Sequence, residues 1–115
     1  MTVVGYAMDN QLPLSLQIYK AHTDWNKLRH EYDVLEGMRD VLRAQKVLEE
    51  HNDGEIAISK AEVLVKASEW YGDYIRQCAS SKRLMLDAQA KHAYLVNLAL
   101  EQRDDGFQER FAAKL

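Results

Sequence analysis

Apolar residues recur every three or four positions, without a break, over two long stretches of this chain. The first stretch, Leu14 to Glu50, contains no proline and a single glycine, and the second also contains no proline. Spacing of this kind forms the seam of a coiled coil, so the sequence predicts an all-α fold. The first seam is Leu14, Ile18, Ala21, Trp25, Leu28, Tyr32, Leu35, Arg39 and Leu42, and the second is Leu64, Ala67, Tyr71, Tyr74, Cys78, Ser81, Met85, Ala88, His92, Leu95 and Ala99.

The end of the first predicted helix is marked by polar residues and a glycine. The helix begins near Pro13, which is tolerated in a first turn, and ends at about Glu50. The segment that follows, His51-Asn52-Asp53-Gly54, is typical of a helix stop. We expect Gly54 to occupy the C′ position, where a left-handed backbone favours glycine.

The start of the second predicted helix carries a capping motif. Ser59-Lys60-Ala61-Glu62 matches the capping box, and Ile58 with Val63 matches the hydrophobic staple that often accompanies it. The helix is therefore predicted to start at Lys60. It is expected to run to about Arg103, where two aspartates and a glycine follow.

The two seams also predict how the helices pair. In an antiparallel hairpin, the residue numbers of each facing pair add up to the same sum. A sum of 109 pairs Leu42 with Ala67, Leu35 with Tyr74 and Leu14 with Leu95. We predict a long antiparallel two-helix coiled-coil hairpin. Its parts are an N-terminal arm at 1–13, the hairpin at 14–103 with its turn at about 51–59, and a short helix or tail at 104–115.

A second apolar surface lies beside the seams, close to the turn. A thin hairpin buries little surface by itself, so we expect it to dimerise into a four-helix arrangement and to bind a protein partner there. In the alternative, this surface is covered by the N-terminal arm or by Phe107, Phe111 and Leu115. The predicted partner or dimer residues are Val34, Met38, Val41, Leu48, Ile56, Ile58, Val63 and Trp70.

Charge is uneven along the chain, although the net charge is only -3. Residues 31–75 are strongly acidic, and the stretches on either side are basic. The basic residues provide an alternative function, contact with nucleic acid. A variant of the protein-binding function is mimicry of nucleic acid by Glu49, Glu50, Asp53 and Glu55. The candidate nucleic-acid contacts are Lys20, Lys27, Arg29, Arg76, Lys82, Arg83 and Lys91.

The sequence offers little catalytic chemistry, so we expect a protein that is not an enzyme and that has no catalytic, cofactor or metal site. His92 and Cys78 occupy seam positions, which favours packed side chains over a metal ligand or a nucleophile. No apolar run approaches the roughly 18 residues of a membrane span, so no membrane contact is expected. The N-terminal residues lack the pattern of a signal peptide, and we expect a cytoplasmic location.

The second helical stretch also carries a resemblance. Residues Ser59-Lys60-Ala61-Glu62-Val63-Leu64-Val65-Lys66-Ala67-Ser68-Glu69 are followed by Tyr74, Ala79, Lys82, Ala88, Lys91 and Tyr94. This pattern of alanine, lysine and aromatic residues resembles small helical phage and prophage proteins of unassigned activity, encoded among early or recombination genes. The resemblance implies an accessory protein in a bacterial host cell that acts on DNA-processing machinery or on a host protein.

Overall fold

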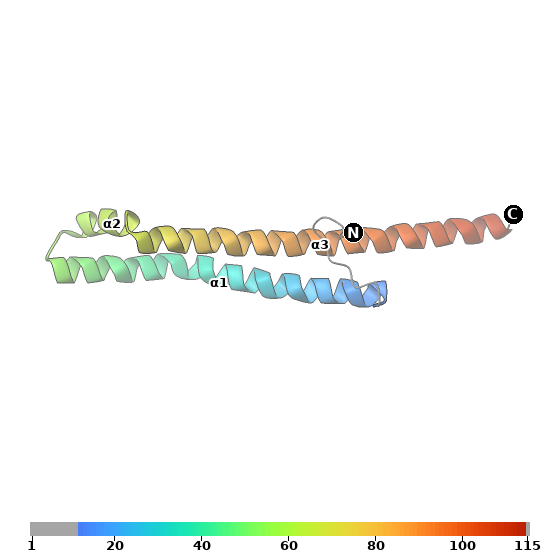
Figure 1. Ribbon diagram of the computed structural model, residues 1–115, viewed down its shortest axis with the longest axis horizontal. Helices are drawn as coiled ribbons and strands as arrows, with labels where there is room; N and C mark the ends of the chain where they lie inside the picture. Colours follow the sequence, from blue (N-terminus) through green and yellow to red (C-terminus); the bar gives the residue numbers. More distant parts are fainter. Residues whose placement is uncertain (1–11, 115) are drawn as a thin grey trace. The chain divides into compact units, whose positions relative to one another are not determined.

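The computed structural model describes residues 12–114, without the side chains of residues 107, 113 and 114, and most of this range is helical (Figure 1). The helices are α1 (Leu14–Gly54), α2 (Ile58–Lys66) and α3 (Glu69–Lys114). No strand occurs between residues 12 and 114, so the all-α prediction is confirmed. Most of the predicted N-terminal arm, residues 1–11, lies outside the described residues, as do the Phe107 side chain and Leu115.

The start of α1 follows the prediction, but its end does not. The Pro13 carbonyl accepts hydrogen bonds from the main-chain N–H groups of Leu16 and Gln17, at 3.0 and 3.1 Å. At the other end, Gly54 is the last helical residue, and the left-handed backbone belongs to Glu55, with φ at 49°. The prediction of Gly54 at C′ is therefore wrong. His51 ties this end to the following segment, because its Nδ1 donates to the Ile56 carbonyl at 2.5 Å.

The capping box predicted at Ser59 is absent from the structure. α2 begins at Ile58, Ala57 is its N-cap residue, and no side chain caps the helix. The staple is also wrong, because Ile58 and Val63 are both exposed. Since α2 begins before Ser59, the Ser59 hydroxyl falls inside the helix, where it does not meet the free N–H groups of the first turn.

The second predicted helix is broken in two. α2 ends at Lys66, and α3 begins at Glu69 after two residues, Ala67 and Ser68. Ser68 is the residue that caps α3, because its Oγ accepts the main-chain N–H of Tyr71 at 3.2 Å. Its hydroxyl donates to the Val65 carbonyl at 2.6 Å and so also closes the end of α2.

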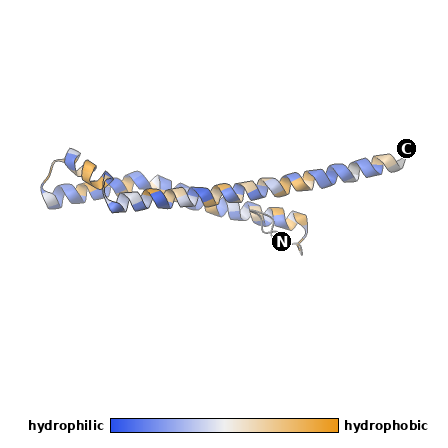
Figure 2. Cartoon of the chain, turned by 45° about the horizontal axis from the view of Figure 1, so that its top comes forward, coloured by the Kyte–Doolittle hydropathy of each residue, from blue (hydrophilic) through white to orange (hydrophobic). Residues whose placement is uncertain are grey.

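The C-terminal end of α3 also differs from the prediction. α3 continues through Gly106 to Lys114, so the helix end expected at Arg103 is wrong. A glycine costs only about 1 kcal/mol in a helix interior, and good helix formers follow shortly after it at Gln108, Glu109 and Arg110. The hydropathy colours of Figure 2 show apolar and hydrophilic residues alternating along this helix.

The chain divides into two compact units, and α1 and α3 contribute to both. The central unit is Leu28–Leu84, and the terminal unit combines Met1–Lys27 with Met85–Leu115. In each unit, the α1 seam and the α3 seam from Tyr71 to Ala99 are buried or half-buried, as predicted. At the start of the second seam the prediction is wrong: Leu64 and Ala67 are exposed, and Ala61 and Val65 of α2 are buried instead.

Candidate protein-binding surface

The core of the central unit lies where α2 packs on the last part of α1. Val47 of α1 and the α2 residues Ala61 and Val65 are buried together. Ile56 and Trp70 pack against this cluster and are half-buried. These two residues were predicted to face a partner, but the structure uses them to support α2. The Lys46 ammonium, 5.7 Å from the centre of the Trp70 ring, covers that ring further.

The other six predicted partner residues are exposed. Their exposed fractions run from 44% at Val34 to 65% at Val63, which is high for side chains of this size. Four of them are on α1 and two are on α2, so the surface is shared by both helices of the central unit. The six residues are Val34, Met38, Val41 and Leu48 on α1, and Ile58 and Val63 on α2.

The four α1 residues belong to one continuous face of the helix. At 100° per residue, this face is centred about 135° from the seam that packs on α3. No residue within this face is charged, and two of its members, Gly37 and Ala44, are small. We call this the α1 face, and it consists of Val34, Gly37, Met38, Val41, Ala44, Gln45 and Leu48.

A groove of about 380 Å³ adjoins the α1 face, between α1 and α2. Ala44, Val47, Leu48 and Ile58 provide its apolar lining. Charged side chains of both signs complete the lining, and two of them, Asp40 and Arg43, form an ion pair at 3.2 Å. The remaining charged residues in the lining are Glu62 and Lys66.

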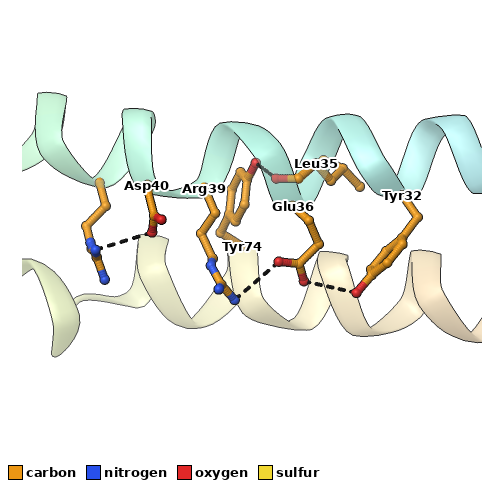
Figure 3. A network of polar contacts seen from close by, with 7 residues as sticks. Tyr32, Leu35, Glu36, Arg39, Asp40 and Tyr74 are labelled. Carbon is orange, nitrogen blue, oxygen red and sulfur yellow. Dashed lines mark hydrogen bonds and ion pairs between the residues drawn. The ribbon is translucent and has the colours of Figure 1, made fainter.

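A polar network holds α1 against α3 beside this face (Figure 3). The Tyr74 hydroxyl donates to the Leu35 carbonyl at 2.6 Å. Glu36 accepts a hydrogen bond from the Tyr32 hydroxyl at 3.3 Å and forms an ion pair with Arg39 at 3.5 Å. Along this contact, Trp70 of α3 lies near Lys46 of α1, and the later residue Tyr74 contacts the earlier Leu35.

Burial favours the protonated, neutral forms of the two tyrosines in this network. Desolvation is the main cause that raises the pKa of Tyr32 and of Tyr74, and the Glu36 carboxylate raises both further. Burial likewise raises the pKa of the Cys78 thiol, which is only 3% exposed. A buried, protonated thiol is a poor nucleophile, so the structure places Cys78 as the small buried side chain that its seam position predicts.

The basic residues predicted to contact nucleic acid are divided between the two units. Lys20, Lys27 and Lys91 belong to the terminal unit. Of the four in the central unit, Arg76 forms an ion pair with Asp73 on its own helix. All seven except Lys91 are exposed, and the central-unit members are Arg29, Arg76, Lys82 and Arg83.

His92 packs among aromatic rings in the terminal unit. Its ring centre lies 5.5 Å from that of Trp25 and 5.2 Å from that of His22. The Asn26 amide donates to His22 Nε2 at 3.0 Å. Within the described part of the chain, no group of three or more histidine, cysteine or acidic side chains is placed to hold a metal ion. No helix in residues 12–114 is long and apolar enough to cross a membrane.

Comparisons with protein-family models, with curated proteins and with solved structures gave no match to this chain. The function is therefore argued from its own residues.

Sequence reasoning missed two features of this surface. The first is the groove, because it depends on the break between α2 and α3, and Ser68 followed by Glu69 was the signal for that break. A serine N-cap with an acidic residue in the first turn is a helix start. The second is the interhelical hydrogen bond from the Tyr74 hydroxyl to the Leu35 carbonyl. The predicted helix pairing places these two residues opposite each other, but it does not specify a hydrogen bond between them.

Proposed function

We propose that this protein is a non-enzymatic accessory protein that acts by binding another protein through the α1 face. The observation that carries the proposal is the exposure of large apolar side chains on a helix face without charge. Val41 and Leu48 are each 53% exposed, and the side chains of Val34 and Met38 are exposed to nearly the same extent. Large apolar side chains grouped on one exposed face mark interaction sites more often than scattered ones do.

The form of the surface favours a helical partner. The α1 face is a straight stripe whose large residues are three, four and seven positions apart, the spacing that packs against another helix. The groove beside it widens the apolar contact toward Ile58. The charged groups in the groove lining suit the polar rim of such an interface.

Two parts of the proposal concern architecture and setting. We propose an antiparallel hairpin, supported by the burial of the predicted seams within each unit and by the order of the α1–α3 contacts in the central unit. We also propose that the hairpin dimerises into a four-helix arrangement. The setting, a phage or prophage accessory protein in a bacterial cytoplasm, rests on the resemblance of roughly residues 25–103 to such proteins.

The proposal is tested by capturing proteins from a bacterial lysate on the immobilised full chain. The variant Val41→Glu puts a charge in the middle of the α1 face, where it would be desolvated by a bound partner. The matched control is Leu84→Glu, because Leu84 is an apolar residue of α3 with a similar exposed fraction, 56%. We expect a specific partner to bind wild type and the control but not Val41→Glu. Identical binding to all three proteins would contradict the proposal.

A second function is supported by the exposure of adjacent basic residues in the central unit. Lys82 and Arg83 are both exposed on α3 and could contact phosphates. This function predicts binding to labelled single- or double-stranded DNA that weakens steeply as salt rises. Fluorescence anisotropy of wild type and of a Lys82→Gln, Arg83→Gln variant tests it, and equal affinity of the two proteins would exclude these residues as the site.

A further inference from the structure

We infer that the α1 face is occupied by α1 of a second copy of this chain, antiparallel to the first, with the two-fold axis at Val41. This inference rests on the proposed function, since it names the partner of the same face. The whole contact lies within the central unit, because the α1 face extends only from Val34 to Leu48.

The first argument is the angle between the two apolar faces of α1. One face packs on α3 through Tyr32, Leu35 and Leu42, and the α1 face lies about 135° around the helix from it. A helix in a four-helix bundle has more than one neighbour, so it needs more than one apolar face. Within the central unit, α3 packs on the first face and α2 packs at Val47, and the large residues of the α1 face stay exposed.

The second argument is the symmetry of the α1 face about Val41. A two-fold axis at this residue places each position opposite the position equally far on the other side of Val41 in the partner. Met38 then faces the partner's Ala44, and Gly37 faces the partner's Gln45. Each large side chain meets a small one, and a Cβ added at Gly37 would meet no other atom within 4 Å, so space is open there.

The outer positions of the face complete the symmetric pattern. Val34 faces the partner's Leu48, and Val41 faces the partner's Val41, so apolar residues meet at the centre and at both ends. Two of the mirrored pairs are complementary in size, because Met38 and Gln45 are large where the residues opposite them, Ala44 and Gly37, are small. A second copy requires matching of this kind, because an isologous interface must be complementary to itself.

The third argument concerns charge. Between residues 34 and 48 the charged side chains of α1 all lie outside the α1 face. Asp40, at the edge toward the groove, is paired with Arg43 at 3.2 Å, and Glu36 is paired with Arg39 at 3.5 Å. A second copy of α1 therefore brings no unpaired charge into the contact, and the apolar centre is desolvated without a carboxylate or an ammonium group.

The register is tested by oxidative cross-linking of single-cysteine additions in the full chain. Val41→Cys places two thiols at the axis, within disulfide reach when the helices pack closely. The matched control is Gln45→Cys, because antiparallel helices hold these two thiols about 12 Å apart along the helix axis. Wild type is a second control, since Cys78 is buried. We expect a disulfide-linked dimer from Val41→Cys and none from either control.

Mixing two variants gives an independent test of the same register. Met38→Cys and Ala44→Cys should each fail to cross-link alone, because like positions lie about 9 Å apart along the axis. An equal mixture should form a cross-linked heterodimer. Cross-linking of Gln45→Cys as efficient as that of Val41→Cys would show a parallel pair and overturn the inference.

The mass in solution separates this inference from the proposed function. Sedimentation equilibrium should give twice the chain mass of 13.3 kDa for wild type and for Leu84→Glu, and one chain mass for Val41→Glu. Wild type that sediments as a monomer, together with a Val41→Cys variant that does not cross-link, overturns the second copy as partner. Under that result the capture experiment still decides whether the α1 face binds another protein.

Discussion

Tyr74 on α3 donates its hydroxyl hydrogen to the main-chain carbonyl of Leu35 on α1, 2.6 Å away. This bond joins residues 39 positions apart in the sequence. The tyrosine is 8% exposed, so water does not compete freely for its hydroxyl. The bond therefore fixes both the rotation of α3 about its axis and its position along that axis, relative to α1 within the central unit.

The first prediction concerns this bond. Replacing Tyr74 by Phe removes the hydroxyl and keeps the ring, so we expect a loss of about 1 kcal/mol in the free energy of unfolding. Urea denaturation at a fixed protein concentration measures it. The control is Tyr71→Phe on the same helix, where we expect a smaller change. A loss at Tyr71 equal to that at Tyr74 would contradict the assignment.

The second prediction concerns the serine that caps α3. Ser68→Ala removes the acceptor for the Tyr71 N–H, and we expect a loss of about 1 kcal/mol. Ser59→Ala should change stability much less, because Ser59 does not cap α2. Comparing the urea midpoints of the two variants decides between the two candidate helix starts. The reverse order would restore the capping box predicted from sequence.

The third prediction concerns which face of α2 is buried. Val65 is 3% exposed and Val63 is 65% exposed. Val65→Ala should therefore cost roughly 1–3 kcal/mol, because it removes buried methyl groups and leaves a cavity against Val47. The same change at Val63 should cost far less. Thermal and urea unfolding of the two variants test this, and equal losses would mean that α2 is rotated from the orientation described.

The fourth prediction concerns alkaline pH. Burial raises the pKa of Cys78 above its ordinary value of 9.0 and the pKa of Tyr74 above 10.0. The folded protein therefore holds these protons more tightly than the unfolded chain does. Their contribution to stability is complete below about pH 9 and is lost as pH rises, because the unfolded chain ionises first.

The alkaline effect is measured by urea denaturation at about pH 8 and about pH 10. We expect the free energy of unfolding of wild type to fall between these values. A Cys78→Ala variant should lose less over the same interval, since it lacks the group that ionises first in the unfolded chain. A decline of the same size in both proteins would show that other groups cause it.

Much of the fold follows from local sequence patterns. The seams of α1 and α3 were predictable because a heptad repeat maintained over many turns leaves only one stripe for burial. Residues such as Leu35, Tyr74 and Cys78 were placed correctly on this basis. The start of α1 was predictable for a similar reason, since Pro13 suits a first helical turn and no other breaker lies nearby.

The region from Gly54 to Ser68 was not predictable, because two local signals competed there. Ser59 with Glu62 and Ser68 with Glu69 both look like helix starts, and sequence alone does not rank them. Packing decides between them: Ala61 and Val65 bury against Val47 only when the helix is interrupted before Glu69. The same interruption draws Trp70 onto this cluster, so Trp70 is half-buried, whereas Val34 and Val41 are exposed.

The two-residue break between α2 and α3 sets which side of α2 is buried. A continuous helix would turn Leu64 and Ala67 inward, whereas the break turns the buried side of α2 by about 100° so that Ala61 and Val65 face α1. The Ser68 hydroxyl favours the second arrangement by satisfying backbone groups of both helices. One inserted or deleted residue at Ala67 would rotate α2 by a similar angle, so the length of this short segment decides which side chains line the groove.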